Sequence, residues 1–238
     1  LVIFAADNEG GGYLAAVHRR SGKIAWRKQR PAEATYSSPN LLRLDGRDQL
    51  VISGGEKVTA YDPQTGDQLW SVDGTATGTC GTVIADGDFV FASGGYPEAD
   101  TVCIRAAGSP EAVWHSREKA YVPSMLFHDR HLYLVDGESG VAYCLDAATG
   151  GQKWRTRLGG KVRSSPVLSG DRIYLPYAAG KVFVFRANSE KFELLAENQF
   201  SDPATAEIYA SPTICAGRMY LRVADRAVSP LVIGVGNG

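Results

Sequence analysis

The sequence lacks several features that would point to a particular function. Its 25 Lys and Arg residues are nearly balanced by 26 Asp and Glu residues, so the net charge is −1. A chain without a basic excess offers no electrostatic face for nucleic acid. No apolar run approaches the roughly 18 residues of a membrane-spanning helix. No segment keeps a 3.6-residue apolar period over a helical length. These absences argue against a nucleic-acid-binding protein, a helical membrane protein and a helical fold.

Metal-binding and disulfide patterns are also missing. The four cysteines, Cys80, Cys103, Cys144 and Cys215, form neither an adjacent pair nor a CxxC motif. We expect free thiols that fill small core positions, and a disulfide between Cys80 and Cys103 stays open as an alternative. His128 and His131 lie in a turn phrase without a third ligand, so we predict no metal site.

What the sequence does have is a repeat that ends in tryptophan. Trp26, Trp70, Trp114 and Trp154 follow one another at intervals of 44, 44 and 40 residues, and a fifth copy places Leu195 where the tryptophan would stand. A period of 40-odd residues indicates a repeat architecture. The residues that recur in each copy are therefore expected to build the repeat.

Each repeat reads as four short strands. Between residues 161 and 195, apolar and β-branched runs are separated by Gly170-Asp171, Ala179-Gly180 and Asn188-Ser189. Four antiparallel strands repeated radially make a β-propeller blade. We predict that residues 1–238 form one all-β propeller domain.

The phrase before each tryptophan has a mechanical explanation. Asp62 and Asp146 can accept hydrogen bonds from turn amides, and the glycine that follows can adopt positive φ. The large indole can then pack between neighbouring blades. We assign this structural docking role to the tryptophans and to the two aspartates, namely Trp26, Trp70, Trp114, Trp154, Asp62 and Asp146.

These phrases resemble the tryptophan-docking repeat of quinoprotein alcohol dehydrogenases and their non-catalytic PQQ-like relatives. Residues 61–70 (YDPQTGDQLW) and 145–154 (LDAATGGQKW) match well, and residues 17–26 match with Arg19 in place of the aspartate. The chain is most similar to the secreted, BamB-like branch. The resemblance implies an eight-bladed propeller located in the periplasm or outside the cell.

The strand count is smaller than eight blades require. Hairpins of second and third strands are expected to begin near Leu1, Leu50, Phe89, Leu132, Ile173 and Met219, and inner strands near Tyr36, Thr79, Tyr121, Val162 and Tyr209. This count gives four complete blades and two partial ones. We interpret the chain as a fragment of a larger propeller, or alternatively as a six-bladed ring that lacks two strands.

The resemblance to quinoprotein alcohol dehydrogenases implies what an enzyme of this kind would need. Those enzymes hold pyrroloquinoline quinone and Ca²⁺, and they have a disulfide between adjacent cysteines. This sequence has no adjacent cysteines and no acidic cluster in the inner strands that could bind Ca²⁺. We therefore expect no catalytic residues, no quinone and no calcium.

Five residues stand at equivalent places just before the inner strands: Tyr36, Thr79, Tyr121, Arg163 and Tyr209. Inner strands converge on the propeller axis, so these side chains are predicted to surround one mouth of the channel. Aromatic and arginine side chains there would suit a peptide or an anionic ligand. The alternative is that they plug the channel or pack against loops.

The function that fits these observations is a non-enzymatic scaffold or binding module with a protein or peptide partner. Two other hypotheses stay open: a fragment of a quinone-dependent dehydrogenase, and a sensor domain fused to a kinase. One fold hosts many functions, so the repeat does not decide between them.

Overall fold

The computed structural model describes residues 1–200, 202, 206–225 and 228–236. Their regular secondary structure is all strand, and no helix in this part of the chain could cross a membrane. The chain divides into two compact units, Leu1–Tyr121 and Val122–Gly238. The single-domain organisation stays a prediction.

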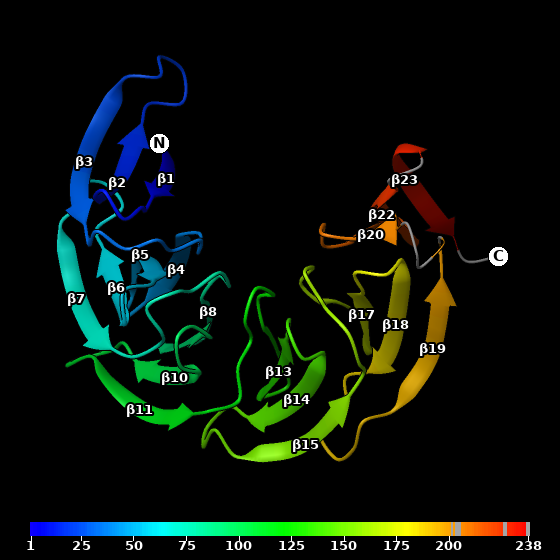
Figure 1. Cartoon of the computed structure of the whole chain (residues 1–238). Coiled ribbons are helices and arrows are strands. Elements are labelled where there is room, and N and C mark those ends of the chain that lie inside the picture. Colours follow the sequence, from blue (N-terminus) through cyan, green and yellow to red (C-terminus); the bar gives the residue numbers. More distant parts are fainter. Residues whose placement is uncertain (201, 203–205, 226–227, 237–238) are drawn as a thin grey trace. The chain divides into compact units, whose positions relative to one another are not determined.

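The first unit contains three antiparallel sheets (Figure 1). One sheet has three strands and the other two have four strands each, in simple up-and-down order. Their bounds are β1 (Val2–Ala6), β2 (Gly12–Val17) and β3 (Ile24–Arg30); β4 (Asn40–Leu44), β5 (Arg47–Ser53), β6 (Lys57–Tyr61) and β7 (Gln68–Asp73); β8 (Ile84–Asp86), β9 (Phe89–Gly94), β10 (Asp100–Arg105) and β11 (Glu111–Ser116).

The second unit contains three more sheets. Two of them repeat the four-stranded order, and in the last one β23 pairs with one edge of β22 while β20 and β21 pair with the other. Their bounds are β12 (Leu126–His128), β13 (His131–Asp136), β14 (Val141–Asp146) and β15 (Gln152–Arg157); β16 (Val167–Ser169), β17 (Arg172–Pro176), β18 (Lys181–Arg186) and β19 (Leu194–Gln199); β20 (Ala206–Glu207), β21 (Thr213–Cys215), β22 (Arg218–Asp225) and β23 (Val228–Gly236).

These sheets are β-propeller blades, as the 40-odd-residue period predicts. All six expected hairpins are present; five of the six sheets have four strands, and the sheet of β1, β2 and β3 has three. The division into four complete blades and two partial ones stays a prediction. The blade count of a larger propeller stays a prediction.

The inner strands begin four or five residues later than predicted. β4 begins at Asn40 where Tyr36 was expected, and β12 begins at Leu126 where Tyr121 was expected. The predicted starting points lie instead in the loops that lead from one sheet to the next. Proline, which has no amide hydrogen to donate to a ladder, follows closely in several of these loops, but β8 begins five residues after Thr79 without a proline between them.

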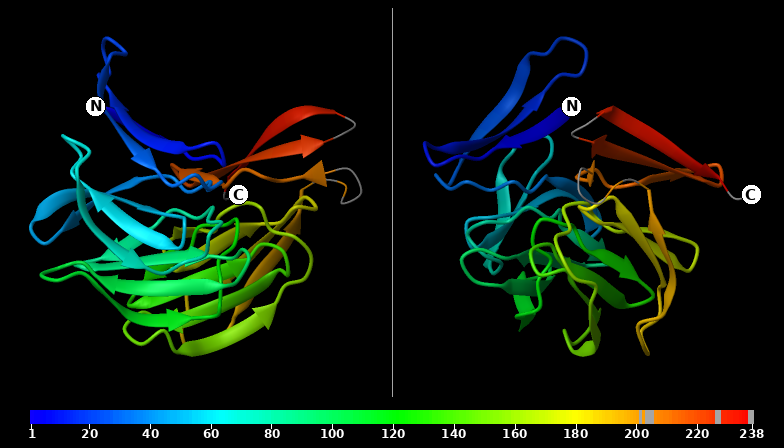
Figure 2. Two further views of the ribbon diagram at one scale, coloured as in Figure 1. Left: turned by 60° about the vertical axis from the view of Figure 1, so that its left-hand side comes forward. Right: turned by 45° about the vertical axis from the view of Figure 1, so that its right-hand side comes forward.

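Side chains from neighbouring sheets form the core within each unit. In the first unit, Val58 and Ala60 of β6 pack with Val90 and Val102 of the next sheet, while Tyr61 faces the first sheet. Figure 2 shows the sheets of this unit stacked side by side. Because both faces of an internal sheet are buried, its central strands are apolar on both sides.

The tryptophan of one blade docks on the turn of the next blade. Trp26 is 8% exposed, and its Nε1 donates a hydrogen bond to Pro63 O at 3.2 Å. Gly66, in the same turn, has φ +73°, and a Cβ there would lie 2.6 Å from Trp26 Cε3. The glycine of the repeat is thus needed both for its backbone angle and for the close approach of the indole.

The aspartate of the turn organises its backbone. Asp62 Oδ1 accepts hydrogen bonds from the amides of Gln64 and Thr65, and Asp146 Oδ1 does the same in its own turn. In the first blade, His18 makes the equivalent backbone hydrogen bonds. The alignment of Arg19 with this aspartate is therefore wrong by one residue.

The other tryptophans vary this arrangement. Trp154 donates to Asn188 O at 2.6 Å in the turn of the next sheet and packs edge-on against Phe185 and Phe192. Trp70 packs with the next sheet but donates to Gln49 of its own sheet at 2.7 Å. Trp114 is half-buried and lies against Phe91.

Candidate functional site

Loops from neighbouring sheets gather on one face of the first unit. Because successive strands alternate in direction, the connectors between sheets and the loop after each second strand leave from the same edge. In this unit these segments are 7–11, 31–39, 54–56, 74–83, 95–99 and 117–121. We call this surface the connector face. The opposite face carries the docking turns, including Asp62–Asp67, and we call it the turn face.

Backbone hydrogen bonds hold the loops of the connector face to one another. The Tyr36 amide donates to Thr79 O at 2.8 Å, and the Gly78 amide donates to Tyr96 O at 2.9 Å. The amides of Gly55 and Glu56 also donate to carbonyls of the following connector. The side chains on these loops are therefore presented by a fixed framework.

Three tyrosines project from this framework. Tyr36 is 75% exposed and Tyr96 is 64% exposed. Tyr121 is half-buried and packs closely on Gly95, where a Cβ would come within 2.4 Å of its ring. Tyr36 and Tyr121 were predicted from the repeat. Tyr96 was missed, because it lies in the loop after β9 and not in the connector position at which the repeats were compared.

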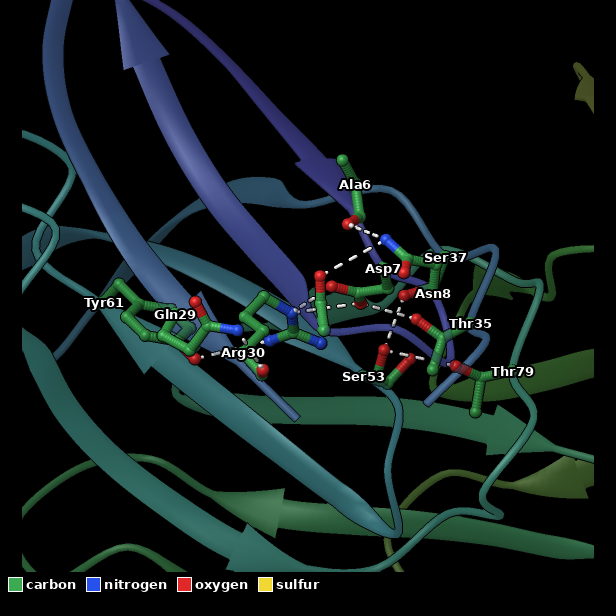
Figure 3. Close-up of polar contacts among 11 residues, drawn as sticks. Ala6, Asp7, Asn8, Gln29, Arg30, Thr35, Ser37, Ser53, Tyr61 and Thr79 are labelled. Atoms are coloured by element: carbon green, nitrogen blue, oxygen red, sulfur yellow. Dashed lines mark hydrogen bonds and ion pairs between the residues drawn. The ribbon is translucent and has the colours of Figure 1, made fainter. Parts of the chain in front are cut away.

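Thr79 does not belong to an exposed site. It is fully buried, and its Oγ1 donates to Ser53 O at 3.1 Å. Ser37 Oγ donates to the same carbonyl at 2.6 Å (Figure 3). The threonine was predicted to line the channel mouth because it occupies the equivalent register position, but its short side chain closes a junction between two loops.

Arg163 and Tyr209 occupy equivalent connectors in the second unit. Arg163 pairs with Glu138 at 2.6 Å, and Lys161 approaches the same carboxylate at 3.5 Å. Burial tends to raise the pKa of Glu138, but the two cations hold its pKa below the ordinary value. Tyr209 is 59% exposed, and its hydroxyl donates to Glu207 at 3.1 Å. The five predicted residues are thus divided between the units, three in the first and two in the second.

The serine before proline in these connectors has a structural role. In the second unit, the Ser124 amide donates to Ser165 Oγ and the Ser165 amide donates to Ser211 Oγ, each at 2.9 Å. Each hydroxyl thereby ties one connector to the preceding one. These hydrogen bonds explain why serine recurs before proline in the connectors, and no ligand is needed to account for it.

A buried ion pair supports the connector face from below. Arg30 Nε lies 2.9 Å from Asp7 Oδ1, and both side chains are only 3% exposed (Figure 3). Thr35 Oγ1 donates to Asp7 at 2.7 Å, and Arg30 donates to the Tyr61 hydroxyl at 3.3 Å. Burial lowers the pKa of Arg30, but the contacts with Asp7 outweigh it and raise the pKa overall. The guanidinium is therefore charged in the folded protein.

A cavity of about 760 Å³ opens on the same face. Its lining includes the acidic residues Glu56, Asp73, Glu98 and Asp100 together with His115 and Arg117, and segments 74–77 and 97–99 complete its wall. This volume is within the range of small-molecule and side-chain binding pockets.

Metal-ligating side chains are not clustered in the described part of the chain. Within this part of the chain, no three His, Cys, Asp or Glu side chains are grouped so that they could hold a metal ion. All four cysteines are free thiols, so the Cys80–Cys103 disulfide is not formed. Cys103 and Cys144 are buried as expected, whereas Cys80 is half-buried and Cys215 is exposed.

Blades with these docking turns define the chain as a PQQ-like β-propeller repeat protein. A family model described as "Outer membrane protein assembly factor BamB" matches residues 1–142 and 127–191. The chain belongs to this family. A comparison with curated protein sequences finds no match.

Solved structures of propellers are similar to this chain at low sequence identity. BamB from Moraxella catarrhalis has a TM-score of 0.70 at 15% identity, over 88% of this chain and 63% of its own length. Sqt1 from Saccharomyces cerevisiae has a TM-score of 0.70 at 13% identity, over 99% of this chain and 69% of its own. Quinohemoprotein alcohol dehydrogenase from Comamonas testosteroni has a TM-score of 0.71 at 11% identity, over 96% of this chain and 51% of its own. At these identities the likeness concerns the fold alone.

Proposed function

We propose that this chain is a non-enzymatic propeller scaffold that binds a protein or peptide partner through the connector face of its first unit. The observation that carries the proposal is the exposure of Tyr36 and Tyr96 on loops that are fixed by hydrogen bonds. Tyrosine is enriched at the energetic centres of interfaces, since its large ring is apolar and its hydroxyl is polar.

The rigidity of these loops favours binding as well. Association costs less entropy when the contacting groups are already ordered. The Arg30–Asp7 pair and the Ser53 carbonyl fix the two connectors that carry Tyr36 and Thr79. Loops on a stable scaffold are the usual place for recognition residues.

The family supports a location outside the cytoplasm. The matching family model is described as an outer-membrane protein assembly factor. We therefore propose that this chain also works outside the cytoplasm. We also propose that it binds neither pyrroloquinoline quinone nor Ca²⁺; for Ca²⁺, the proposal is supported by the absence of a cluster of three or more His, Cys, Asp or Glu side chains among the described residues. The match spans 63% of the length of BamB from Moraxella catarrhalis, so any activity like that of the whole protein is likewise only part of this proposal.

Photo-crosslinking tests the proposal. A photoreactive phenylalanine analogue replaces Tyr36 or Tyr96, and the purified chain is irradiated with an extracytoplasmic fraction of cells that produce it. We expect one covalent adduct, common to both positions. The same analogue at Val113, which is 46% exposed on the outer strand β11, is the control and should give no such adduct.

Two results would contradict the proposal. The first is an equal adduct yield at Val113 and at the two tyrosine positions, which would indicate nonspecific contact. The second is dye-linked alcohol oxidation by the chain after addition of quinone and Ca²⁺, which would support the dehydrogenase alternative.

A further inference from the structure

Two exposed tyrosines of the connector face flank a single connector. The Gly78 amide donates to Tyr96 O at 2.9 Å, and the Tyr36 amide donates to Thr79 O at 2.8 Å. Successive residues of an extended segment direct their backbone groups to opposite sides, so Tyr36 and Tyr96 lie on either side of residues 78–79. Neighbouring extended segments are about 5 Å apart, which places the two tyrosine backbones about 10 Å from each other.

The surface between the two tyrosines is formed by backbone. Gly78 has no side chain, and Thr79 is fully buried. A Cβ at Gly78 would lie 3.6 Å from Tyr96 Cβ and 3.8 Å from Tyr96 Cδ1, so the tyrosine lies on the side to which a side chain at Gly78 would point. The hydroxyls of Tyr36 and Tyr96 make no hydrogen bond within the described residues. We call Tyr36, Gly78 and Tyr96 the tyrosine platform.

The hydrogen bonds of the platform restrict the form of its partner. The amide and the carbonyl of Gly78 are paired with the segment at Tyr96, and the Thr79 carbonyl is paired with Tyr36. A peptide that adds a strand needs unpaired backbone groups at a sheet edge, and these groups are taken. The partner is therefore held by the tyrosine rings and hydroxyls. A peptide in the polyproline II conformation suits this mode, because it has no internal hydrogen bonds and its carbonyls are free to accept.

We propose that the tyrosine platform binds a proline-rich segment in the polyproline II conformation. This helix has three residues per turn and a rise of about 3.1 Å per residue, so equivalent side chains recur about every 9 Å. That repeat is close to the separation of the two tyrosines, so prolines at positions i and i+3 reach both rings. Grooves lined by aromatic residues recognise such segments in other proteins. The inference rests on the proposed function, because it specifies the partner of the same surface.

Charge on the connector face favours basic residues beside the prolines. Glu98, two residues after Tyr96, is exposed and makes no ion pair within the part of the chain that the structure describes. The adjoining cavity has four carboxylates in its lining against one arginine, Arg117, and one histidine. Lys119 lies over the ring of Tyr121, 5.5 Å from its centroid. Charge complementarity therefore places a lysine or arginine of the partner on the Glu98 side of the platform.

Fluorescence anisotropy tests the proposal with a labelled, end-blocked peptide of ten prolines followed by two arginines. We expect saturable one-to-one binding. A glycine–serine peptide of the same length and charge should bind about tenfold more weakly or worse, because a flexible chain loses more entropy. Tyr36→Ala and Tyr96→Ala should each raise Kd about 5- to 30-fold, as at the energetic centre of an interface. The matched control is Tyr209→Ala, a tyrosine 59% exposed in the second unit, which should leave Kd unchanged.

Two further variants test the surface between the rings and the charge beside it. A Cβ at Gly78 has no neighbour closer than 3.6 Å, and φ there is not in the left-handed region, so Gly78→Val should fold. Its side chain would stand beside Tyr96 and should raise Kd about fivefold or more. A variant that urea titration shows to be folded, with an unchanged Kd, would overturn the platform. Glu98→Gln should raise Kd about two- to fivefold at low salt, and only for the probe with arginines.

Three outcomes would overturn the proposal: no saturable binding of the proline probe, equal binding of the glycine–serine probe, or equal losses in Tyr36→Ala and Tyr209→Ala. A helical alanine-rich peptide of the same charge is the remaining probe. If it binds in a tyrosine-dependent way and the proline probe does not, the platform recognises a helix and the inference fails. In each case a crosslinked adduct common to Tyr36 and Tyr96 would leave the proposed function standing, so the two failures can be told apart.

Discussion

The buried ion pair under the connector face gives the strongest stability prediction. Asp7→Asn removes the charge that balances Arg30, while both side chains stay only 3% exposed. Breaking a buried pair leaves an uncompensated charge and costs about 3–5 kcal/mol. Asparagine still offers an oxygen to Thr35, so we expect a loss near the lower limit, about 3 kcal/mol.

Replacing both partners should cost less than replacing one. A combined Asp7→Leu and Arg30→Met variant leaves no buried charge, and such apolar replacements are often neutral or stabilising. The matched control is Asp67→Asn, which removes the partner of Lys28 on the same strand, β3. Lys28 and Asp67 are 39% and 67% exposed, so the control should be almost without effect.

Hydrogen exchange measured by mass spectrometry is the suitable assay. Repeat proteins can unfold in parts, and hydrogen exchange assigns a loss of stability to particular strands, which a global unfolding midpoint detects but does not locate. The opening free energy should fall in β2 and β3 of the Asp7→Asn variant and recover in the double variant. A loss below about 1 kcal/mol, or a double variant less stable than the single one, would refute the assignment of a buried charged pair.

Three further predictions concern the blade junctions and the thiols. Gly66→Ala should cost more than Gly22→Ala, because a Cβ at Gly66 meets the docked indole while one at Gly22 meets nothing within 4 Å; both have positive φ, and urea titration compares them. Equal losses would remove the docking role of that glycine. Trp154→Ala should cost about 3–5 kcal/mol, measured by the same titration, since the indole is 8% exposed and packs on two phenylalanines; an unchanged midpoint would contradict its burial. Iodoacetamide at pH 9 should label exposed Cys215 and spare Cys103, because burial raises the pKa of Cys103 to about 12 and keeps it a thiol; fast labelling of both in the native protein would contradict this.

The blades were predictable from sequence because their determinants are local. An aspartate, a glycine and a tryptophan within nine residues specify one turn and the tryptophan that docks on the next blade. The number of blades then follows from how often this pattern repeats along the chain. The structure has these turns at Asp62 and Asp146, with the hydrogen bonds that the residue types allow.

The connector face was only partly predictable, because it depends on which loops come together. Asp7 and Arg30 are 23 residues apart, one in the loop after β1 and the other at the end of β3, so nothing in the sequence indicates their pairing. Tyr96 and the cavity lie outside the repeated phrase. Thr79 was misassigned because register alone does not tell whether a side chain points to solvent or closes a junction.

The measurement that tests the central claim most directly is hydrogen exchange of the chain with and without its crosslinked partner. The account predicts protection of segments 31–39, 74–83 and 95–99, which carry Tyr36 and Tyr96 or line the cavity. It predicts no change at the docking turn Asp62–Asp67 on the turn face. Protection confined to that turn or to the outer strands, with the connector segments unchanged, would contradict a binding site on the connector face.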